Sequence, residues 1–309
     1  MAQLVRSARG AVIALVAPLA LAFLSACNND DDSPTGTGSS TQIVFSSDRN
    51  STDGSLELYS TNADGSDVRR LTTSPEDDYE PAWSSTGRIA FTSSRDGNDE
   101  IYSMSADGSD VKRLTNNTFL DELPSWSPDG SRIAFTSRRD GNLEIYVMNA
   151  DGTGQTRLTN SPATETGPHW SPNGSRIAFQ TDRDANNFEI YMMNADGTAP
   201  TRLTNNPGVD LFSSWAPDGQ RFAFQSTRDN LTTGSTEIYT SNVDGTGITR
   251  LTQNSFFDNY PQWSTDGKRI AFHSNRDGNS EIYTMAVNGS DVVRVTNNTA
   301  SDVFAAWRP

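Results

Sequence analysis

The chain has 309 residues and carries 39 acidic against 24 basic side chains, so its formal net charge is −15 at pH 7. A surface this acidic argues against binding to nucleic acid or directly to anionic lipid, because both are negatively charged, and it permits a cation or a basic partner. The single cysteine excludes an internal disulfide and any metal site built from several thiolates.

Residues 1–26 have the pattern of a leader peptide. Arg6 and Arg9 give a basic start, and residues 11–23 form an apolar stretch that is too short to span a membrane comfortably. The stretch ends in Leu-Ser-Ala-Cys27, which resembles the lipobox of bacterial lipoproteins. The resemblance implies cleavage before Cys27 and acylation of this cysteine. The alternative is an ordinary secretory signal followed by a chance cysteine.

Residues 27–42 are predicted to be the lipidated cysteine and a flexible linker, since residues 28–41 are mostly Asn, Asp, Ser, Thr and Gly. Asn28 follows the cysteine, at a position where lipoproteins held at the inner membrane usually carry Asp. The resemblance therefore implies an outer-membrane lipoprotein that faces the periplasm and contacts the membrane only through its lipid.

Residues 43–309 repeat one unit six times. The clearest marker is a tryptophan that recurs every 43 to 48 residues, at Trp83, Trp126, Trp170, Trp215, Trp263 and Trp307. A fixed period of this size is typical of repeat architectures. Because every unit needs the same bulk to pack on the next, we interpret these Trp residues, and the Phe and Tyr that recur with them, as core.

Each unit predicts four short strands. They contain the Trp, the Ile-Ala-Phe, the Glu-Ile-Tyr and the Arg-Leu-Thr sequences, in which large residues alternate with small or polar ones. Turns of the Ser-Pro-Asp-Gly and Ala-Asp-Gly types separate them. Four-stranded units of this length read as blades, so the pattern predicts an all-β fold, a six-bladed β-propeller with four-stranded antiparallel blades.

The register of the repeats predicts how the ring closes. The chain enters the first unit at its second strand, with Ile43, and ends at residues 302–307 with a Trp strand that has no unit after it. Pairing of this C-terminal strand with the N-terminal blade completes that blade and removes two exposed sheet edges.

The motif Pro-x-Trp-Ser-Pro-Asp-Gly-x-Arg-Ile-Ala-Phe, followed by Asp-Gly-x-x-Glu-Ile-Tyr, resembles the TolB-type propeller repeat, or PD40 repeat. The same repeat builds propellers attached to prolyl-oligopeptidase-like peptidases. TolB itself carries an α/β domain before its propeller, where this chain has the linker. The resemblance covers residues 43–309 and implies a propeller protein of the cell envelope.

Each unit also carries an acid five residues before its Trp, at the start of the strand that is predicted to be innermost. A ring of six carboxylates at one mouth of the central channel would favour a bound cation, and hard oxygen ligands suit Ca²⁺. The alternative is that each acid caps backbone N–H groups where its strand begins. The six acids are Asp78, Asp121, Glu165, Asp210, Asp258 and Asp302.

A second set of repeated charges consists of six arginines that follow the second strand and six glutamates that begin the third. We expect each Arg to form a cross-strand ion pair with the Glu of its own hairpin, and a polar substrate site is the alternative. The arginines are Arg49, Arg95, Arg139, Arg183, Arg228 and Arg276, and the glutamates are Glu57, Glu100, Glu144, Glu189, Glu237 and Glu281.

Little in the sequence indicates catalysis. It has no Gly-x-Ser-x-Gly motif and no appended α/β domain to hold a nucleophile. Its two histidines, His169 and His273, lie in different units. They match poorly the histidine-rich metal sites of similar propeller polysaccharide lyases, so we interpret both as structural and the protein as a non-enzyme.

The units differ most in the loops on the face that carries the acids. Variation confined to one face is how repeat proteins present a binding surface, and the alternative is drift in unconstrained loops. The candidate protein-binding residues are Tyr79, Phe119, Phe212, Phe257, Tyr260 and Phe304. We predict a monomeric, non-catalytic scaffold for an envelope protein or peptide. The alternatives are a glycan-binding or polysaccharide-lyase-like propeller that uses the channel mouth, and a purely structural envelope protein.

Overall fold

The computed structural model describes residues 42–184 and 187–309. The predicted leader, the candidate lipidation site Cys27 and the linker lie outside these residues and stay predictions. Within the described part of the chain, no helix is long and apolar enough to cross a membrane.

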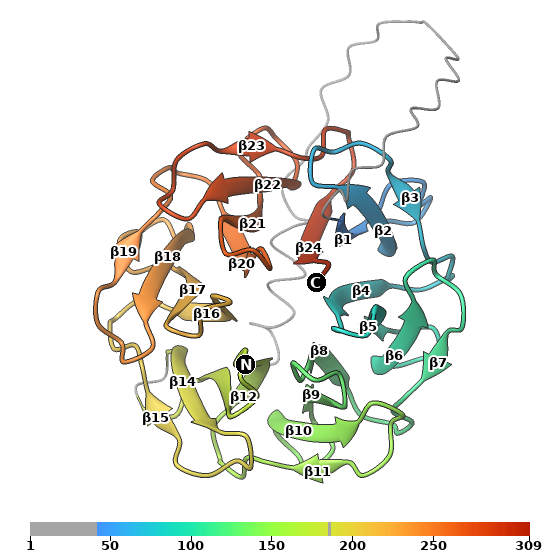
Figure 1. Ribbon diagram of the computed structural model, residues 1–309, viewed down its shortest axis with the longest axis horizontal. Coiled ribbons are helices and arrows are strands. Elements are labelled where there is room, and N and C mark those ends of the chain that lie inside the picture. Colours follow the sequence, from blue (N-terminus) through green and yellow to red (C-terminus); the bar gives the residue numbers. More distant parts are fainter. Residues whose placement is uncertain (1–41, 185–186) are drawn as a thin grey trace, which may run out of the picture. The chain divides into compact units, whose positions relative to one another are not determined.

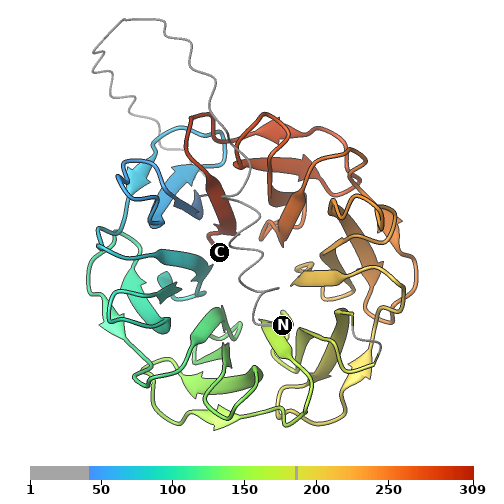
Figure 2. The same cartoon turned by 180° about the vertical axis from the view of Figure 1, so that it is seen from behind.

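The described residues form six four-stranded antiparallel sheets around a central axis (Figures 1 and 2), as the repeat predicts. Each sheet is one blade. We number as blade 1 the sheet of β24, β1, β2 and β3, and as blades 2 to 6 the sheets that follow it in chain order.

The four strands of a blade run from the axis outward in the order in which the sequence predicts them. The innermost strands are β24 (Asp302–Trp307), β4 (Asp78–Trp83), β8 (Asp121–Trp126), β12 (Glu165–Trp170), β16 (Asp210–Trp215) and β20 (Asp258–Trp263). The second strands are β1 (Gln42–Ser47), β5 (Arg88–Ser93), β9 (Arg132–Ser137), β13 (Arg176–Thr181), β17 (Arg221–Ser226) and β21 (Arg269–Ser274).

The outer half of each blade is uneven in length. The third strands are β2 (Glu57–Asn62), β6 (Glu100–Ser105), β10 (Glu144–Asn149), β14 (Glu189–Asn194), β18 (Glu237–Asn242) and β22 (Glu281–Ala286). The outermost strands have only two residues each: β3 (Arg69–Arg70), β7 (Lys112–Arg113), β11 (Thr156–Arg157), β15 (Thr201–Arg202), β19 (Thr249–Arg250) and β23 (Val293–Arg294). Such short outer strands leave little free edge for pairing with another chain.

The core lies between the blades and not within one of them. Ala90 on the second strand of blade 2 packs against Trp126, Ile133 and Phe135 of blade 3. The other junctions repeat this contact, with Val44 in the place of Ala between blades 1 and 2. Alternation along a strand places Ala on one face and Ile and Phe on the other, so each Ile-Ala-Phe sequence serves two neighbouring junctions. The six Trp side chains are buried in these clusters, which confirms their interpretation as core.

The ring closes through β24, as predicted. Ile43 of β1 faces Trp307 of β24, and Ser47 faces Asp302, in an antiparallel pair. The last strand therefore supplies the innermost strand that the N-terminal blade lacks.

Each innermost strand contains a β-bulge. The register against the second strand shifts between the second and fifth residues of all six strands. The third residue takes a left-handed conformation, with φ between 52° and 64°, and we call these six positions the bulge residues: Glu80, Leu123, Gly167, Phe212, Tyr260 and Phe304. A bulge of this kind turns its side chain out of the normal alternation, here toward the central axis.

Side chains from the preceding blade hold the bulges in place. The backbone N–H of Phe212 donates to Gln180 Oε1 at 2.6 Å, and that of Tyr260 donates to Gln225 Oε1 at 2.9 Å. In blade 1 the Phe304 N–H points to Nδ1 of the buried His273 at 3.5 Å. His273 is thus part of the bulge support, in keeping with its predicted structural role.

The turns between third and fourth strands pack closely on the neighbouring blade, which allows a matched test. Gly108 has φ +85°, and a Cβ atom there would overlap the carbonyl oxygen of Leu71 in blade 1. Gly54 has the same φ but no atom within 4 Å of its Cβ position. We expect Gly54→Ala to lower the free energy of unfolding by about 1–2 kcal/mol and Gly108→Ala by about 3–4 kcal/mol, measured by urea denaturation. Equal losses would show that the contact with Leu71 is not tight.

Candidate functional site: the central channel

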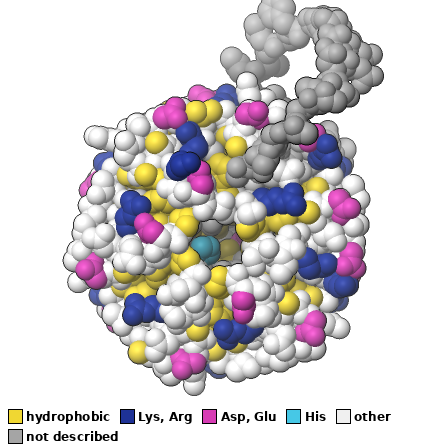
Figure 3. All heavy atoms as spheres, viewed as in Figure 1, with side chains coloured by type: hydrophobic (Ala, Val, Ile, Leu, Met, Phe, Trp, Pro, Cys, Tyr) yellow, Lys and Arg dark blue, Asp and Glu magenta, His cyan; other side chains and the backbone are white. Residues whose placement is uncertain are grey.

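The innermost strands enclose a cavity of about 320 Å³ on the propeller axis. Figure 3 shows the opening at the centre of one face, bordered by hydrophobic side chains. All six bulge residues line the cavity, followed along each strand by residues nearer the tryptophans. The six repeats differ chemically at this position, which holds one acid, one aliphatic residue, one glycine and three aromatic residues.

The aromatic bulge residues gather on one side of the channel. The Phe212 and Tyr260 rings are stacked with centroids 3.7 Å apart, and Phe304 meets Tyr260 edge-on at 4.5 Å. His273 lies 5.4 Å from the Tyr260 ring. We call Phe212, Tyr260, Phe304 and His273 the aromatic cluster. Blades 5, 6 and 1 thus give the channel an aromatic wall, whereas blades 2, 3 and 4 present Glu80, Leu123 and Gly167.

The six candidate protein-binding residues do not form one surface. Phe212, Tyr260 and Phe304 are half-buried in the channel wall. Tyr79 is only 4% exposed and packs 6.3 Å from the Phe304 ring, so its side chain is not available on the loop face. Phe119 and Phe257 are exposed, at 46% and 38%, in the loops before β8 and β20. Strand alternation accounts for Tyr79, since it precedes the bulge and keeps the inward-packing face.

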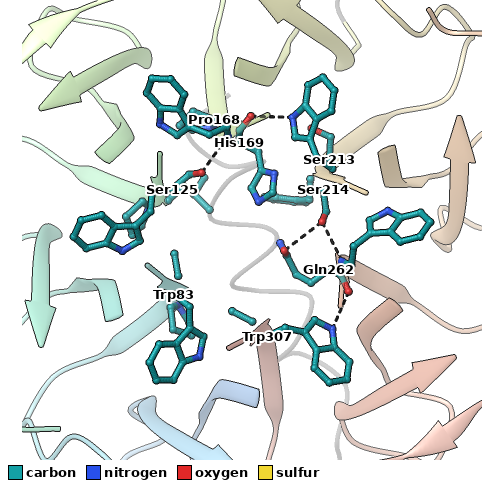
Figure 4. Close-up of a pocket in the computed structure, with 18 of the residues that line it drawn as sticks. Trp83, Ser125, Pro168, His169, Ser213, Ser214, Gln262 and Trp307 are labelled. Carbon is teal, nitrogen blue, oxygen red and sulfur yellow. Dashed lines mark hydrogen bonds between the residues drawn. The ribbon is translucent and has the colours of Figure 1, made fainter. Parts of the chain in front are cut away.

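Deeper in the channel, polar groups gather on blades 3 to 6 (Figure 4). Ser125 Oγ accepts the Trp170 N–H at 3.3 Å. Ser214 Oγ accepts the Trp263 N–H at 3.2 Å and donates to Gln262 Oε1 at 3.3 Å. These bonds fix the polar side chains against the tryptophan backbone of the neighbouring blade.

Apart from tryptophan indole nitrogens, two polar atoms in this wall have no hydrogen-bond partner among the described residues, Ser213 Oγ and His169 Nδ1. Ser213 is 5% exposed and lines the cavity. His169 is half-buried, and its carbonyl oxygen accepts the Trp215 indole N–H at 3.1 Å. Burial lowers the pKa of His169 to about 4, so its imidazole is neutral at pH 7. The sequence analysis interpreted His169 as a purely structural residue, and the structure shows that it also lines the channel.

The six repeated acids do not form an open ring at a channel mouth. Each side chain is fully buried at the start of its strand and paired with the arginine that follows the second strand of its own blade. In blade 3, Asp121 Oδ2 accepts Arg139 Nη2 and Asn117 Nδ2, both at 2.7 Å. Burial raises the pKa of Asp121, and its bonds to Ser137 and Arg139 oppose that rise.

This geometry bears on the predicted cation site. Among residues 42–184 and 187–309, no group of three or more His, Cys, Asp or Glu side chains is placed to hold a metal ion. The pairing with arginine favours a structural role for the six acids over a role as ligands of a cation. Ca²⁺ binding by the six acids stays a prediction that calcium titration would check.

The expected pairing of the second-strand arginines with the third-strand glutamates is wrong. Arg139 binds Asp121, while Glu144 is bound by Arg157 of the fourth strand. The reason lies in the register: Ser137 stands between Asp121 on one side and Glu144 on the other. Arg139 Nε donates to Ser137 Oγ at 2.8 Å, which directs the guanidinium inward to Asp121. In each of the other blades, too, the third-strand glutamate is paired with the arginine of the fourth strand.

Sequence reasoning missed the residues of the channel wall, Glu80, Ser125, His169, Ser213 and Gln262. A signal was present, because the three residues before each Trp vary between units, whereas the Asp-Gly turns between the strands are nearly uniform. Variation at one place in a repeat marks the surface that is free of the shared packing.

Comparison with known proteins supports the fold. A family model described as the TolB beta propeller domain matches residues 230–309, and one described as the Tricorn protease N-terminal beta propeller domain matches residues 151–248. A comparison with curated proteins gives no match.

Solved structures are similar over most of the chain. TolB from Acinetobacter baumannii has 21% identity and a TM-score of 0.79, over 87% of this chain and 67% of that one. A putative TolB from Agrobacterium tumefaciens has 22% identity and a TM-score of 0.66, over 87% and 99%. An oligogalacturonate lyase in complex with manganese has 14% identity and a TM-score of 0.57, over 84% and 74%.

Fold and site together define a closed six-bladed β-propeller with an aromatic and polar central channel. Residues 230–309 match the TolB propeller family model, and the described chain shares its fold with the two TolB structures.

Proposed function

We propose that this protein is a non-catalytic scaffold of the bacterial cell envelope, anchored to the outer membrane by a lipid on Cys27, that binds a protein or peptide partner. The binding face is the one with the mouth that the bulge residues line. The observation that carries the proposal is the aromatic cluster, which places three half-buried rings in the channel wall. Aromatic side chains in such partly enclosed sites are the usual anchors of protein interfaces.

The surrounding loops extend this face. Phe119 and Phe257 stand exposed in loops that lead into β8 and β20, at the same end of the innermost strands as the bulges. Phe257 is held by a backbone N–H bond to Asn275 Oδ1 at 2.9 Å, so its loop is anchored to the next loop of the face. A partner that contacts both exposed rings and the channel mouth would span several blades.

A second candidate is a glycan-binding propeller, with the polysaccharide-lyase-like form as its catalytic variant. Its support is the shared fold of the oligogalacturonate lyase and the mixture of aromatic and hydroxyl groups in the channel. Only one of the two histidines, His169, lines the cavity.

Affinity capture from envelope extract tests the scaffold function. The full chain, purified in detergent, would be compared with a variant carrying Phe212→Ser, Tyr260→Ser and Phe304→Ser. We expect one protein to be recovered in near-stoichiometric amount by the parent chain and lost with the variant, because the aromatic anchors provide most of the contact energy.

A matched control replaces exposed apolar residues on the outer rim, Val68→Ser and Val111→Ser, and should retain the partner. Thermal unfolding of every variant checks that the propeller is intact. Recovery of the same proteins by parent and aromatic variant would contradict the proposal, and binding of envelope polysaccharide without any protein would favour the glycan candidate.

A further inference from the structure

The cavity contains a single charged side chain among the described residues that line it, that of Glu80. Its Oε2 atom accepts Thr92 Oγ1 at 2.9 Å and the Leu123 backbone N–H at 3.1 Å. The carboxylate is thus fixed in the wall between blades 2 and 3. With a chain of net charge −15 around it, this cavity attracts cations and disfavours anions.

Hydrogen-bond acceptors lie beyond Glu80 along the channel. Ser213 follows its bulge residue by one position, and Ser125 and Gln262 follow theirs by two. Two strand positions span roughly 7 Å. Ser213 Oγ, buried and without a partner in the described residues, is a polar atom that an occupant of the cavity could bind. The neutral His169 adds a further polar atom and no positive charge to repel a cation.

The aromatic cluster supplies the other half of a cation site. A ring face attracts a cation within about 6 Å, and the methylene stem of a basic side chain packs well on aromatic carbon. Tyr260 and Phe304 line the cavity together with Glu80. The combination of one carboxylate, neutral acceptors and aromatic wall suits an organic cation on an apolar stem.

Other occupants fit these residues less well. Ca²⁺ takes six or more oxygen ligands, usually with several carboxylates, whereas Glu80 supplies the one side-chain carboxylate among the described residues that line the cavity. A planar guanidinium prefers two parallel bonds to a carboxylate, and Glu80 Oε2 already accepts two protein donors. A compact ammonium with three donors needs only separate acceptors.

We propose that the central cavity receives one primary ammonium group, supplied by a lysine side chain of the protein or peptide that the scaffold binds. The source of this lysine rests on the proposed function. The lysine stem lies along Tyr260 and Phe304, its ammonium is bound by Glu80, and the serine and glutamine oxygens of blades 3, 5 and 6 line the same cavity as neutral acceptors.

The first test uses Nα-acetyl-lysine methylamide as the probe and the full chain in detergent. The tryptophans border the cavity, so occupancy is followed by their fluorescence and by calorimetry. We expect saturable binding with a Kd in the range of about 1–10 mM for so small a ligand. The Nε-acetylated form and the norleucine analogue, which lack the charge, are expected to bind at least about ten-fold more weakly.

Glu80→Gln is the decisive variant, because its amide oxygen can still accept from Thr92 and Leu123 while the charge is lost. We expect it to weaken lysine binding by about ten-fold. Glu76→Gln removes an exposed carboxylate outside the cavity and should change nothing. Equal binding by charged and acetylated probes, no saturation by about 100 mM lysine probe, or an unchanged Kd in Glu80→Gln would overturn the proposal.

The two proposals fail separately. If a partner is captured equally by the parent and by Glu80→Gln and the lysine probe does not bind, the scaffold stands and the lysine site is wrong. If the probe binds but no protein partner exists, the cavity is a site for free amines. The proposal of a partner lysine and the scaffold function are then both wrong. An arginine analogue that binds as tightly as lysine would contradict the choice of ammonium.

Discussion

Replacing Arg139 by Met is expected to lower the free energy of unfolding by about 3–5 kcal/mol, because it leaves a buried carboxylate without its counter-charge. The partner, Asp121, has a side-chain exposure of 0%, and the ion pair is 2.7 Å long. Arg139 also lies over the Tyr146 ring, with its guanidinium carbon 4.7 Å from the centroid. Urea denaturation measures the loss.

The pH dependence separates lost charge pairing from lost packing. Burial already raises the folded-state pKa of Asp121 above its ordinary value, and removal of Arg139 raises it further. A raised folded-state pKa means that the folded protein holds its proton more tightly than the unfolded chain, so stability is gained below this pKa and lost as pH rises through it. The deficit of Arg139→Met should therefore be smaller near about pH 5 than near about pH 7.5.

Two further variants complete this test. Adding Asp121→Asn to Arg139→Met removes the uncompensated charge and should recover much of the loss at neutral pH. Lys268→Met breaks an exposed pair with Asp266, in which the side chains are 79% and 56% exposed, and should give no measurable change. A deficit that does not vary with pH would mean that Arg139 acts through packing alone.

Removal of residues 302–309 is expected to abolish cooperative unfolding, since it deletes β24 and opens the ring. The deletion exposes one edge of β1, where Ile43, Val44 and Phe45 are completely buried in the intact protein. It also removes Trp307 from the cluster that joins blades 6 and 1. An open apolar edge favours association between chains, so we expect oligomers or aggregate in size-exclusion chromatography and a broad thermal transition.

A circular permutant provides the control. Arg308 N–H donates to Gln42 O at 2.9 Å, so a short Gly-Ser linker can join residue 309 to residue 42. Opening the chain between Pro162 and Ala163 then makes every blade continuous in sequence. This permutant should keep the oligomeric state of the parent chain and unfold cooperatively. A truncated chain that unfolds as sharply as the parent would show that closure by β24 is dispensable.

The fold could be predicted because its information is local and repeated. The spacing of Trp83 and its five equivalents sets the blade length, and the turn residues set the strand ends. Alternation within Ile-Ala-Phe places its residues on the two faces of the blade. The positions of Ile43 and Trp307 in the repeat predict that the ring closes by pairing of their strands. Each of these signals acts within one repeat or between two adjacent ones.

The site could be predicted only in part, because it depends on which neighbour each side chain meets. The strand before Arg139 lies between two strands that each begin with an acid, Asp121 and Glu144. The hydrogen bond from Arg139 to Ser137 directs the guanidinium to Asp121. Phe212 and Tyr79 were assigned to one surface, yet one is a bulge residue and the other precedes a bulge. The residue types Glu, Leu, Phe and Tyr do not predict a left-handed backbone conformation, which Gly and Asn adopt far more readily.

The bulges also separate what the repeat must keep from what it can change. At each of them one side chain leaves the alternation that builds the junction between blades, so its identity is not constrained by that junction. The channel lining can therefore vary at six positions of one shared framework, three of which, Phe212, Tyr260 and Phe304, contact one another. A left-handed residue other than glycine costs about 1–2 kcal/mol, so Gly167 is the least strained state of this position. In protein design, the channel lining could be changed by substituting the bulge residue of one blade at a time, starting from a variant with glycine at that position.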